Sequence, residues 1–164
     1  MTNKPWENEP DRVEFRYKGF PCLIVRNQGG SLCGYAGVPP SHSLHGKTCH
    51  STFPESNFDK KIDDIEIHGG VTFTGACQED GPICHKPEPG EPDNVWWVGF
   101  DCAHYGDFMP HMDDPDTDLQ KSLYPDEDMR KARAREKLSY SKYRNIAYVK
   151  NEIRRLVKQL EKAA

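Results

Sequence analysis

The sequence predicts an α+β domain, in which a mostly antiparallel sheet with long loops packs against a long amphipathic C-terminal helix. Short segments rich in β-branched and aromatic residues, separated by glycine and proline, fill the first two thirds of the chain. The last third carries apolar residues at helical spacing. We expect a flexible tail over residues 1–12 and a single domain over 13–164, with sheet and loops in 13–118 and helices in 125–163.

Strands are expected where apolar runs are bounded by turn residues. Residues 13–26 alternate apolar with charged side chains around a KGFP turn, which is typical of a β-hairpin. The run VWWVGF at 95–100 is the most apolar, so we expect it to be the central strand. Two further strands are expected to meet at a glycine pair. In chain order the expected strands are the hairpin, 32–38, 62–68, 71–74 and 95–100.

The C-terminal third is expected to be helical. Pro125 is followed by three acidic residues, and acids are favoured in the first turn of a helix because of its positive end. Beyond Ser139, apolar residues recur every three or four positions and form one helix face. These residues are Ile146, Val149, Ile153, Leu156 and Leu160. We expect this face to pack on the sheet, and a homodimer through the same face is the alternative.

From the composition we expect neither a membrane-spanning segment nor a signal for export. No stretch approaches the ~20 apolar residues of a membrane span, and the polar start of the chain has no apolar signal core. We therefore expect a cytoplasmic protein, whose six cysteines are thiols or metal ligands rather than a disulfide framework. For Cys77 and Cys84 the sequence leaves thiols, metal ligands and a disulfide open, since it contains no C-x-x-C motif.

Residues that carry chemistry are concentrated in two short segments. Asp101, His104 and Asp107 follow the expected central strand at spacings of three, a pattern that suits a divalent metal such as Zn²⁺ or Mn²⁺. The same carboxylates could orient the histidine for general acid–base catalysis. His68 is expected as a second acid–base group or ligand, so these four residues are the candidate catalytic set.

Four further residues are candidates for holding a ligand. Gly69 and Gly70 follow His68 directly, and their backbone N–H groups could approach and hold an anion. Tyr35 and Tyr105 could stack on a base. Each feature also has a structural interpretation, because glycine pairs form turns or bulges and histidines near strands are commonly hydrogen-bonded in place. Only convergence of the two segments would make them a site.

The sequence lacks the motifs of several enzyme classes. It contains no GxxxxGK[ST], GxGxxG or GxSxG, so P-loop NTPases, dinucleotide oxidoreductases and α/β-hydrolases are excluded. Charge is uneven, with ten Lys/Arg against twenty Asp/Glu in residues 1–125 and twelve against six in 126–164. The basic residues of the last third alternate with acids. We therefore expect a solvated helix face there rather than a nucleic-acid partner.

Several motifs taken together resemble an uncharacterised group of small bacteriophage and prophage proteins. They are GYAGVPP at 34–40, HGGVTF at 68–73, WWVGFDCAHYGD at 96–107, and the pairs Tyr143-Arg144 and Tyr148-Val149. The resemblance covers most of the chain from Val13 onward. It implies an accessory phage protein made in the host cytoplasm, where many such proteins counter host defence, some by cutting or sequestering nucleotide signals.

Two classes of function follow from these expectations. In the first, the chain is a small metal-assisted hydrolase that acts on a nucleotide or another phosphate-containing ligand. In the second, it is a binding module without chemistry, which sequesters a small nucleotide-like ligand or blocks a host protein. The sequence leaves the choice between enzyme and binding module open.

Overall fold

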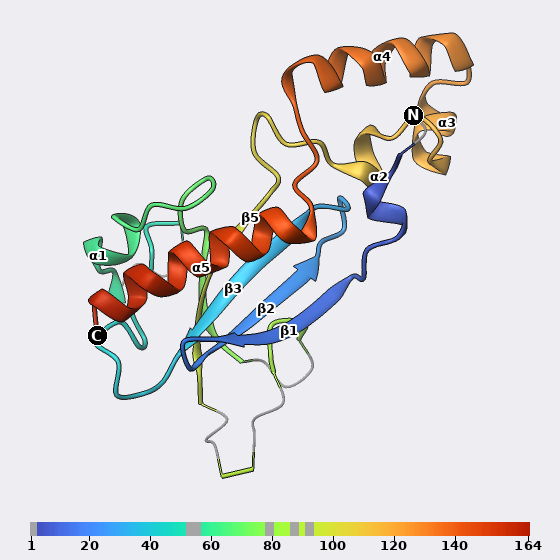
Figure 1. Cartoon of the computed structure of the whole chain (residues 1–164). Coiled ribbons are helices and arrows are strands. Elements are labelled where there is room, and N and C mark those ends of the chain that lie inside the picture. Colours follow the sequence, from blue (N-terminus) through green and yellow to red (C-terminus); the bar gives the residue numbers. More distant parts are fainter. Residues whose placement is uncertain (1–2, 52–56, 78–80, 86–88, 91–93) are drawn as a thin grey trace.

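The computed structural model describes residues 3–164 except 52–56, 78–80, 86–88 and 91–93. Its centre is a five-stranded antiparallel sheet in the order β1-β2-β3-β5-β4 (Figure 1). Helices accompany the sheet and the C-terminal helix packs on it, so the expected α+β class is confirmed. The strands are β1 (Arg12–Tyr17), β2 (Phe20–Arg26), β3 (Leu32–Val38), β4 (Phe73–Ala76) and β5 (Trp96–Asp101).

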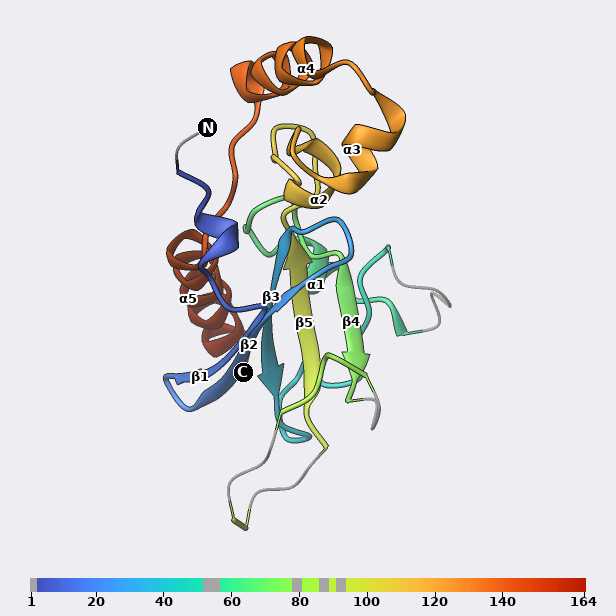
Figure 2. The same cartoon turned by 90° about the vertical axis from the view of Figure 1, so that its right-hand side faces the viewer.

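Four of the helices lie in two places, along the sheet and beyond its end (Figure 2). The longest, α5, runs along one face of the sheet, whereas α2, α3 and α4 gather beyond one end of it (Figure 2). Among the described residues, no helix is both long and apolar enough to cross a membrane. The helices are η1 (Pro5–Glu7), α1 (Lys60–Asp63), α2 (Pro110–Asp113), α3 (Asp118–Leu123), α4 (Glu127–Tyr140) and α5 (Ile146–Lys162).

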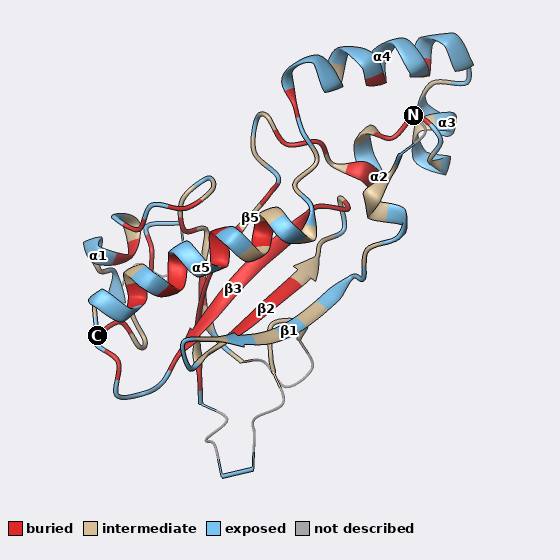
Figure 3. Cartoon of the chain, viewed as in Figure 1, coloured by how far each residue is buried: buried red, intermediate tan, exposed pale blue. Residues whose placement is uncertain are grey.

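The apolar face of α5 supplies much of the core on one side of the sheet. Val149, Ile153, Leu156 and Leu160 have no exposed surface, and the helix contacts β2 and β3 (Figure 3). Burying each of these side chains contributes about 1.5–3 kcal/mol. The expected packing of this face on the sheet is confirmed. The alternative, a homodimer through the same face, stays a prediction, although the chain's own strands cover these residues.

The expected strands differ in how closely they match. The hairpin and the strand at 32–38 are confirmed as β1, β2 and β3. The VWWVGF run forms β5, which lies between β3 and β4 and is therefore an interior strand, but the middle strand is β3, all of whose residues are buried. The strand expected at 71–74 begins two residues later, at Phe73. On the face away from α5, Leu23, Cys33, Tyr35 and Trp97 form a second cluster.

Residues 62–68 do not form the expected strand. Ile62 lies in α1, where the side chain of Asp59 accepts a hydrogen bond from the Lys61 N–H. Further along, the Glu66 N–H donates to Oε1 of Gln159 at 2.7 Å, and its carbonyl accepts from Nε2 of the same side chain at 3.0 Å. An amide side chain from α5 therefore takes the place of a neighbouring strand. The isoleucines that suggested a strand are nonetheless buried: Ile62, Ile65 and Ile67.

The segment expected to be a flexible tail lies against the domain over its described part, residues 3–12. The Trp6 ring contacts the rings of Phe108 and Tyr143 at centroid distances of 5.3 and 5.1 Å. Lys4 Nζ donates to Asp114 Oδ1 at 2.9 Å, and that carboxylate is buried. These contacts join the start of the chain to the loop around α2.

Cys77 and Cys84 form a disulfide, whereas thiols or metal ligands were favoured for the cysteines as a group. The loop that they close includes 78–80, which lie outside the described residues. The Arg12 guanidinium donates to the carbonyls of Pro82 and Cys84, so this loop is tied to β1. The other cysteines are buried thiols: Cys22, Cys33, Cys49 and Cys102.

Candidate functional site

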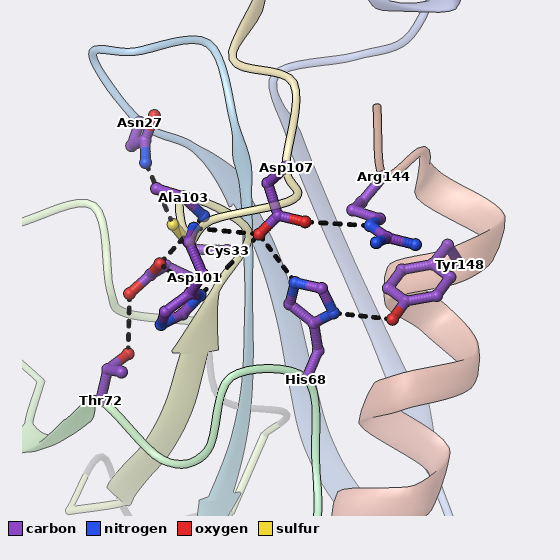
Figure 4. A network of polar contacts seen from close by, with 10 residues as sticks. Asn27, Cys33, His68, Thr72, Asp101, Ala103, Asp107, Arg144 and Tyr148 are labelled. Atoms are coloured by element: carbon purple, nitrogen blue, oxygen red, sulfur yellow. Dashed lines mark hydrogen bonds and ion pairs between the residues drawn. The ribbon is translucent and has the colours of Figure 1, made fainter. Parts of the chain in front are cut away.

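The topology of the sheet brings the two polar segments together. β4 and β5 are antiparallel neighbours, so the residues that precede β4 lie at the same end of the sheet as the residues that follow β5. The Thr72 N–H donates to the Gly99 carbonyl at 3.0 Å and fixes this register. As a result His68, ahead of β4, meets Asp107, after β5, beside the first turn of α5 (Figure 4).

Asp107 makes hydrogen bonds to three residues of the cluster that His68, Asp101, His104, Asp107, Arg144 and Tyr148 form. Its buried carboxylate accepts three hydrogen bonds: Oδ2 from His68 Nε2 at 2.8 Å and from the His104 backbone N–H at 3.0 Å, and Oδ1 from Arg144 Nε at 2.9 Å (Figure 4). Burial acts to raise the pKa of this carboxyl, but the bonds from His68, His104 and Arg144 outweigh it and hold the pKa below its ordinary value. The Asp107 carboxyl is therefore ionised at neutral pH.

His68 is held from both sides of its ring. A carboxylate can only accept, so Nε2 carries the proton shared with Asp107, and in the neutral ring Nδ1 accepts from the Tyr148 hydroxyl at 2.7 Å. Tyr148 lies in the first turn of α5, where the Asn145 side chain caps the helix by accepting from the Tyr148 N–H. The guanidinium of Arg144 also lies 4.9 Å from the Tyr148 ring.

The His104 ring has an unusual environment. Its Nδ1 is buried and, within the described part of the chain, has no hydrogen-bond partner. It lies 3.4 Å from Asp101 Oδ1 and 3.8 Å from Asp107 Oδ2, but neither approach has hydrogen-bond geometry. Asp101 itself is oriented by the Thr72 hydroxyl at 2.9 Å and by the Ala103 N–H at 3.0 Å. This buried nitrogen thus lies at ion-pair distance from two carboxylates and has a hydrogen bond to neither.

These side chains fit the requirements of a metal site. One ligand atom from each of His68, His104 and Asp107 lies within 4.8 Å of the others. Ligands around Zn²⁺ lie about 2.0–2.2 Å from the ion, which places them roughly 3–4 Å from one another. These three side chains could therefore hold a divalent ion in place of the proton that His68 and Asp107 share, once their ligand atoms adjust to that spacing. Tyr148 would then accept from His68 Nδ1, as the outer partner of a metal-bound histidine does.

The glycine pair shapes the site rather than presenting two free amides. Both residues have positive φ, +68° at Gly69 and +78° at Gly70. A Cβ on Gly69 would lie 2.2 Å from Cε1 of His104, so only glycine lets the backbone pass this ring. The Gly70 N–H, expected to hold an anion, donates instead to the Ile67 carbonyl at 3.0 Å. Gly70 therefore closes a turn.

The two tyrosines expected to bind a ligand lie in different places. Tyr35 is buried on the second face of the sheet and lines a hollow of about 520 Å³ together with Asp101 and His104. Tyr105 is 90% exposed and stacks on Tyr140 instead. Of the two tyrosines, Tyr35 therefore lines the described hollow beside Asp101 and His104.

Two residues of the cluster had no functional role in the sequence-based expectations. Arg144 and Tyr148 lie some forty residues beyond Asp107, and their only sequence signal was their place in the motif set. No protein-family model, no curated protein and no solved structure matches the chain. The chemistry of the site is therefore inferred from its own geometry.

Proposed function

We propose that this chain is a metal-dependent hydrolase of phosphate-containing ligands, with a Zn²⁺ or Mn²⁺ ion held by His68, His104 and Asp107. The observation that carries the proposal is Nδ1 of His104, which is buried at ion-pair distance from two carboxylates, beside a second histidine, and has no hydrogen bond within the described part of the chain. Buried polar groups in native proteins nearly always have partners, and a cation supplies the one that is missing here. Two imidazoles and a carboxylate are ordinary ligands for such an ion.

The surrounding residues suit hydrolysis. A bound divalent cation lowers the pKa of a water ligand and polarises a phosphoryl oxygen. Asp101 is partly exposed next to His104, so it can complete the ligand set or accept a proton from attacking water. Arg144 places a guanidinium at the edge of the cluster, and guanidinium groups bind phosphate oxygens well. Nucleotides are the phosphate compounds that the sequence resemblance suggests.

A second function is favoured by the hollow beside His104. Tyr35 and Phe73 meet edge to face at 5.5 Å in its lining, and such rings can contact the planar part of a ligand. In this alternative the chain binds a nucleotide signal and holds it without chemistry. Chromatography after incubation separates the two functions, because a hydrolase yields product and a binding module returns the intact ligand on denaturation.

Metal content tests the proposal directly. Elemental analysis after exposure to Zn²⁺ or Mn²⁺ and removal of excess ion should give one tightly held ion in the wild type and none in His104→Ala. His50→Ala is the matched control, since His50 also faces a carboxylate, Asp63 at 2.9 Å, but is exposed and outside the cluster. It should keep the ion. A wild type that holds no ion, or a His104→Ala variant that holds as much, contradicts the proposal.

The setting of this activity follows from the resemblance to phage proteins. It supports an accessory protein that works in the host cytoplasm and counters defence by removing or holding a nucleotide signal, or by blocking a host protein. Bacteria that express the wild type should then be infected more readily by a defence-sensitive phage than bacteria that express His104→Ala. Equal infection of the two strains would contradict a defence role for this site.

A further inference from the structure

Tyr105 occupies the corner of a tight turn inside the candidate site. The Asp107 N–H donates to the His104 carbonyl at 2.9 Å and closes the turn, and Gly106 has φ +94°, as the third residue of a type II turn requires. The second residue, Tyr105, is thereby pushed outward between two candidate ligands of the metal. At 90% exposure, Tyr105 is the most exposed large hydrophobic residue in the described part of the chain.

The exposed ring is one half of an aromatic platform. Tyr105 and Tyr140, at the end of α4, stack with centroids 5.4 Å apart and planes inclined by 11°. Tyr140 is itself 45% exposed, so stacking covers only part of either ring. Lys137 Nζ lies 5.5 Å from the Tyr140 ring. The platform thus combines flat aromatic surface with a cation.

The chain between α4 and α5 brings two further cations close to the site loop. It runs parallel to the site loop, with the Lys142 N–H donating to the Gly106 carbonyl and the Lys142 carbonyl accepting from the Phe108 N–H, both at 2.9 Å. Lys142 is exposed, and Arg144 follows two residues later with its side chain on Asp107. One extended strip therefore carries, in order, the platform, an exposed lysine and the arginine of the site.

We infer that this strip binds single-stranded nucleic acid, with a base stacked on Tyr105 and the phosphate backbone directed along Lys142 and Arg144 towards His104. Aromatic rings that stack bases and a line of cations are the two elements of single-strand binding. Small ligands favour enclosed pockets, whereas this platform is open, which favours a strand over a mononucleotide. The inference deepens the proposed hydrolase by naming its substrate class, and it rests on that function for the fate of the strand.

This substrate class departs from the expectation drawn from charge. The alternation of acids and bases along 126–164 predicts a solvated helix face and not a nucleic-acid partner. In the structure the residues of the strip are selected by their position beside the site loop, not by the charge of the whole segment. The inference of a nucleic-acid partner therefore rests on where these residues lie beside the site loop.

Fluorescence anisotropy with labelled DNA and RNA strands of about eight nucleotides, within the usual site size of such proteins, tests binding separately from chemistry. Loss of one stacked base corresponds to about 1–3 kcal/mol, so Tyr105→Ala should bind about five- to 150-fold more weakly at low salt. Tyr105→Phe keeps the ring and should bind like the wild type. Leu123→Ala, which removes an exposed side chain on α3, is the control and should also bind normally.

Several outcomes overturn the inference. They are no binding by the wild type, equal binding by Tyr105→Ala, or equal competition by mononucleotides and by duplex of the same sequence. The hydrolase proposal is judged separately by metal content and by product formation. A protein that holds the ion and cleaves a small phosphodiester, yet binds strands independently of Tyr105, refutes the substrate class alone. A protein that holds no ion, yet binds strands through Tyr105, refutes the hydrolase and leaves the binding surface standing.

Discussion

At Gly69 the backbone passes close to the ring of His104, one of the candidate ligands. Its missing side chain leaves room for the His104 ring, because a Cβ there would approach Cε1 to 2.2 Å. Gly70 has a similar positive φ, but a Cβ there would meet nothing within 4 Å. Both glycines therefore require a positive φ, but a side chain would collide with the His104 ring at Gly69 and meet open space at Gly70.

This difference gives a matched pair of variants. Gly70→Ala should lower the free energy of unfolding by about 1 kcal/mol, the cost of placing alanine in left-handed backbone. Gly69→Ala should cost more, since it also displaces the His104 ring, and it should lose the bound ion. Urea denaturation and elemental analysis measure the two effects. Equal stability and equal metal content in the two variants would show that His104 is not held against Gly69.

At the scale of elements, the sequence predicts best what hydrophobic periodicity alone determines. The spacing of apolar residues identifies the buried face of α5, and alternation identifies the β1–β2 hairpin. The segment 62–68 is not predicted, because its isoleucines are buried through α1 and through contacts with α5 instead of a ladder. A long-range partner such as Gln159, 93 residues from Glu66, leaves no trace in local pattern.

The hydrogen bonds from Gln159 in α5 to the backbone of Glu66 can be tested by mutation. Gln159→Ala removes both hydrogen bonds to the backbone of Glu66, so the amide of Glu66 should lose protection from hydrogen exchange. Lys158→Ala, a neighbouring substitution at an exposed position of α5, should leave that protection unchanged. Amide exchange followed by NMR measures the difference. Unchanged exchange at Glu66 in Gln159→Ala would mean that the segment is held by other contacts.

Candidate site residues were predictable to the extent that they adjoin strands. Asp101, His104 and Asp107 stand out by residue type and by their position at and after the end of β5. The antiparallel pairing of β4 with β5 brings His68 to them, although the strand expected to end at His68 does not form. Arg144 and Tyr148 were not predictable, because their roles depend on where the start of α5 lies over the sheet. The exposure of Tyr105 likewise follows from the turn closed by Asp107.

At the scale of the whole molecule, the reactivity of the cysteine thiols depends on their burial and on whether Cys77 and Cys84 are oxidised. Burial raises the pKa of Cys22 to about 12 and of Cys33 to about 11, and it raises the pKa of Cys102 as well. A thiol reacts as its thiolate, so these groups stay protonated and unreactive well below those values. Cys77 and Cys84 are joined to each other.

Thiol titration at about pH 8 should therefore find no reactive group in the native oxidised protein. Unfolding without reductant should expose four thiols, and unfolding with reductant all six. Rapid alkylation in intact bacteria shows the state of the pair in the cell, where the proposed cytoplasmic location would favour its reduced form. Two thiols that react readily in the native oxidised protein would argue against the Cys77–Cys84 pair.

The central claim is that a divalent ion belongs between His68, His104 and Asp107. Anomalous X-ray scattering from crystals grown with Zn²⁺ or Mn²⁺, collected at the metal edge, locates such an ion without assuming any activity. We expect a peak about 2.0–2.2 Å from His68 Nε2, His104 Nδ1 and an Asp107 oxygen, with the Tyr148 hydroxyl accepting a hydrogen bond from His68 Nδ1. Crystals in which the ion lies elsewhere, while His68 remains hydrogen-bonded to Asp107, would contradict it.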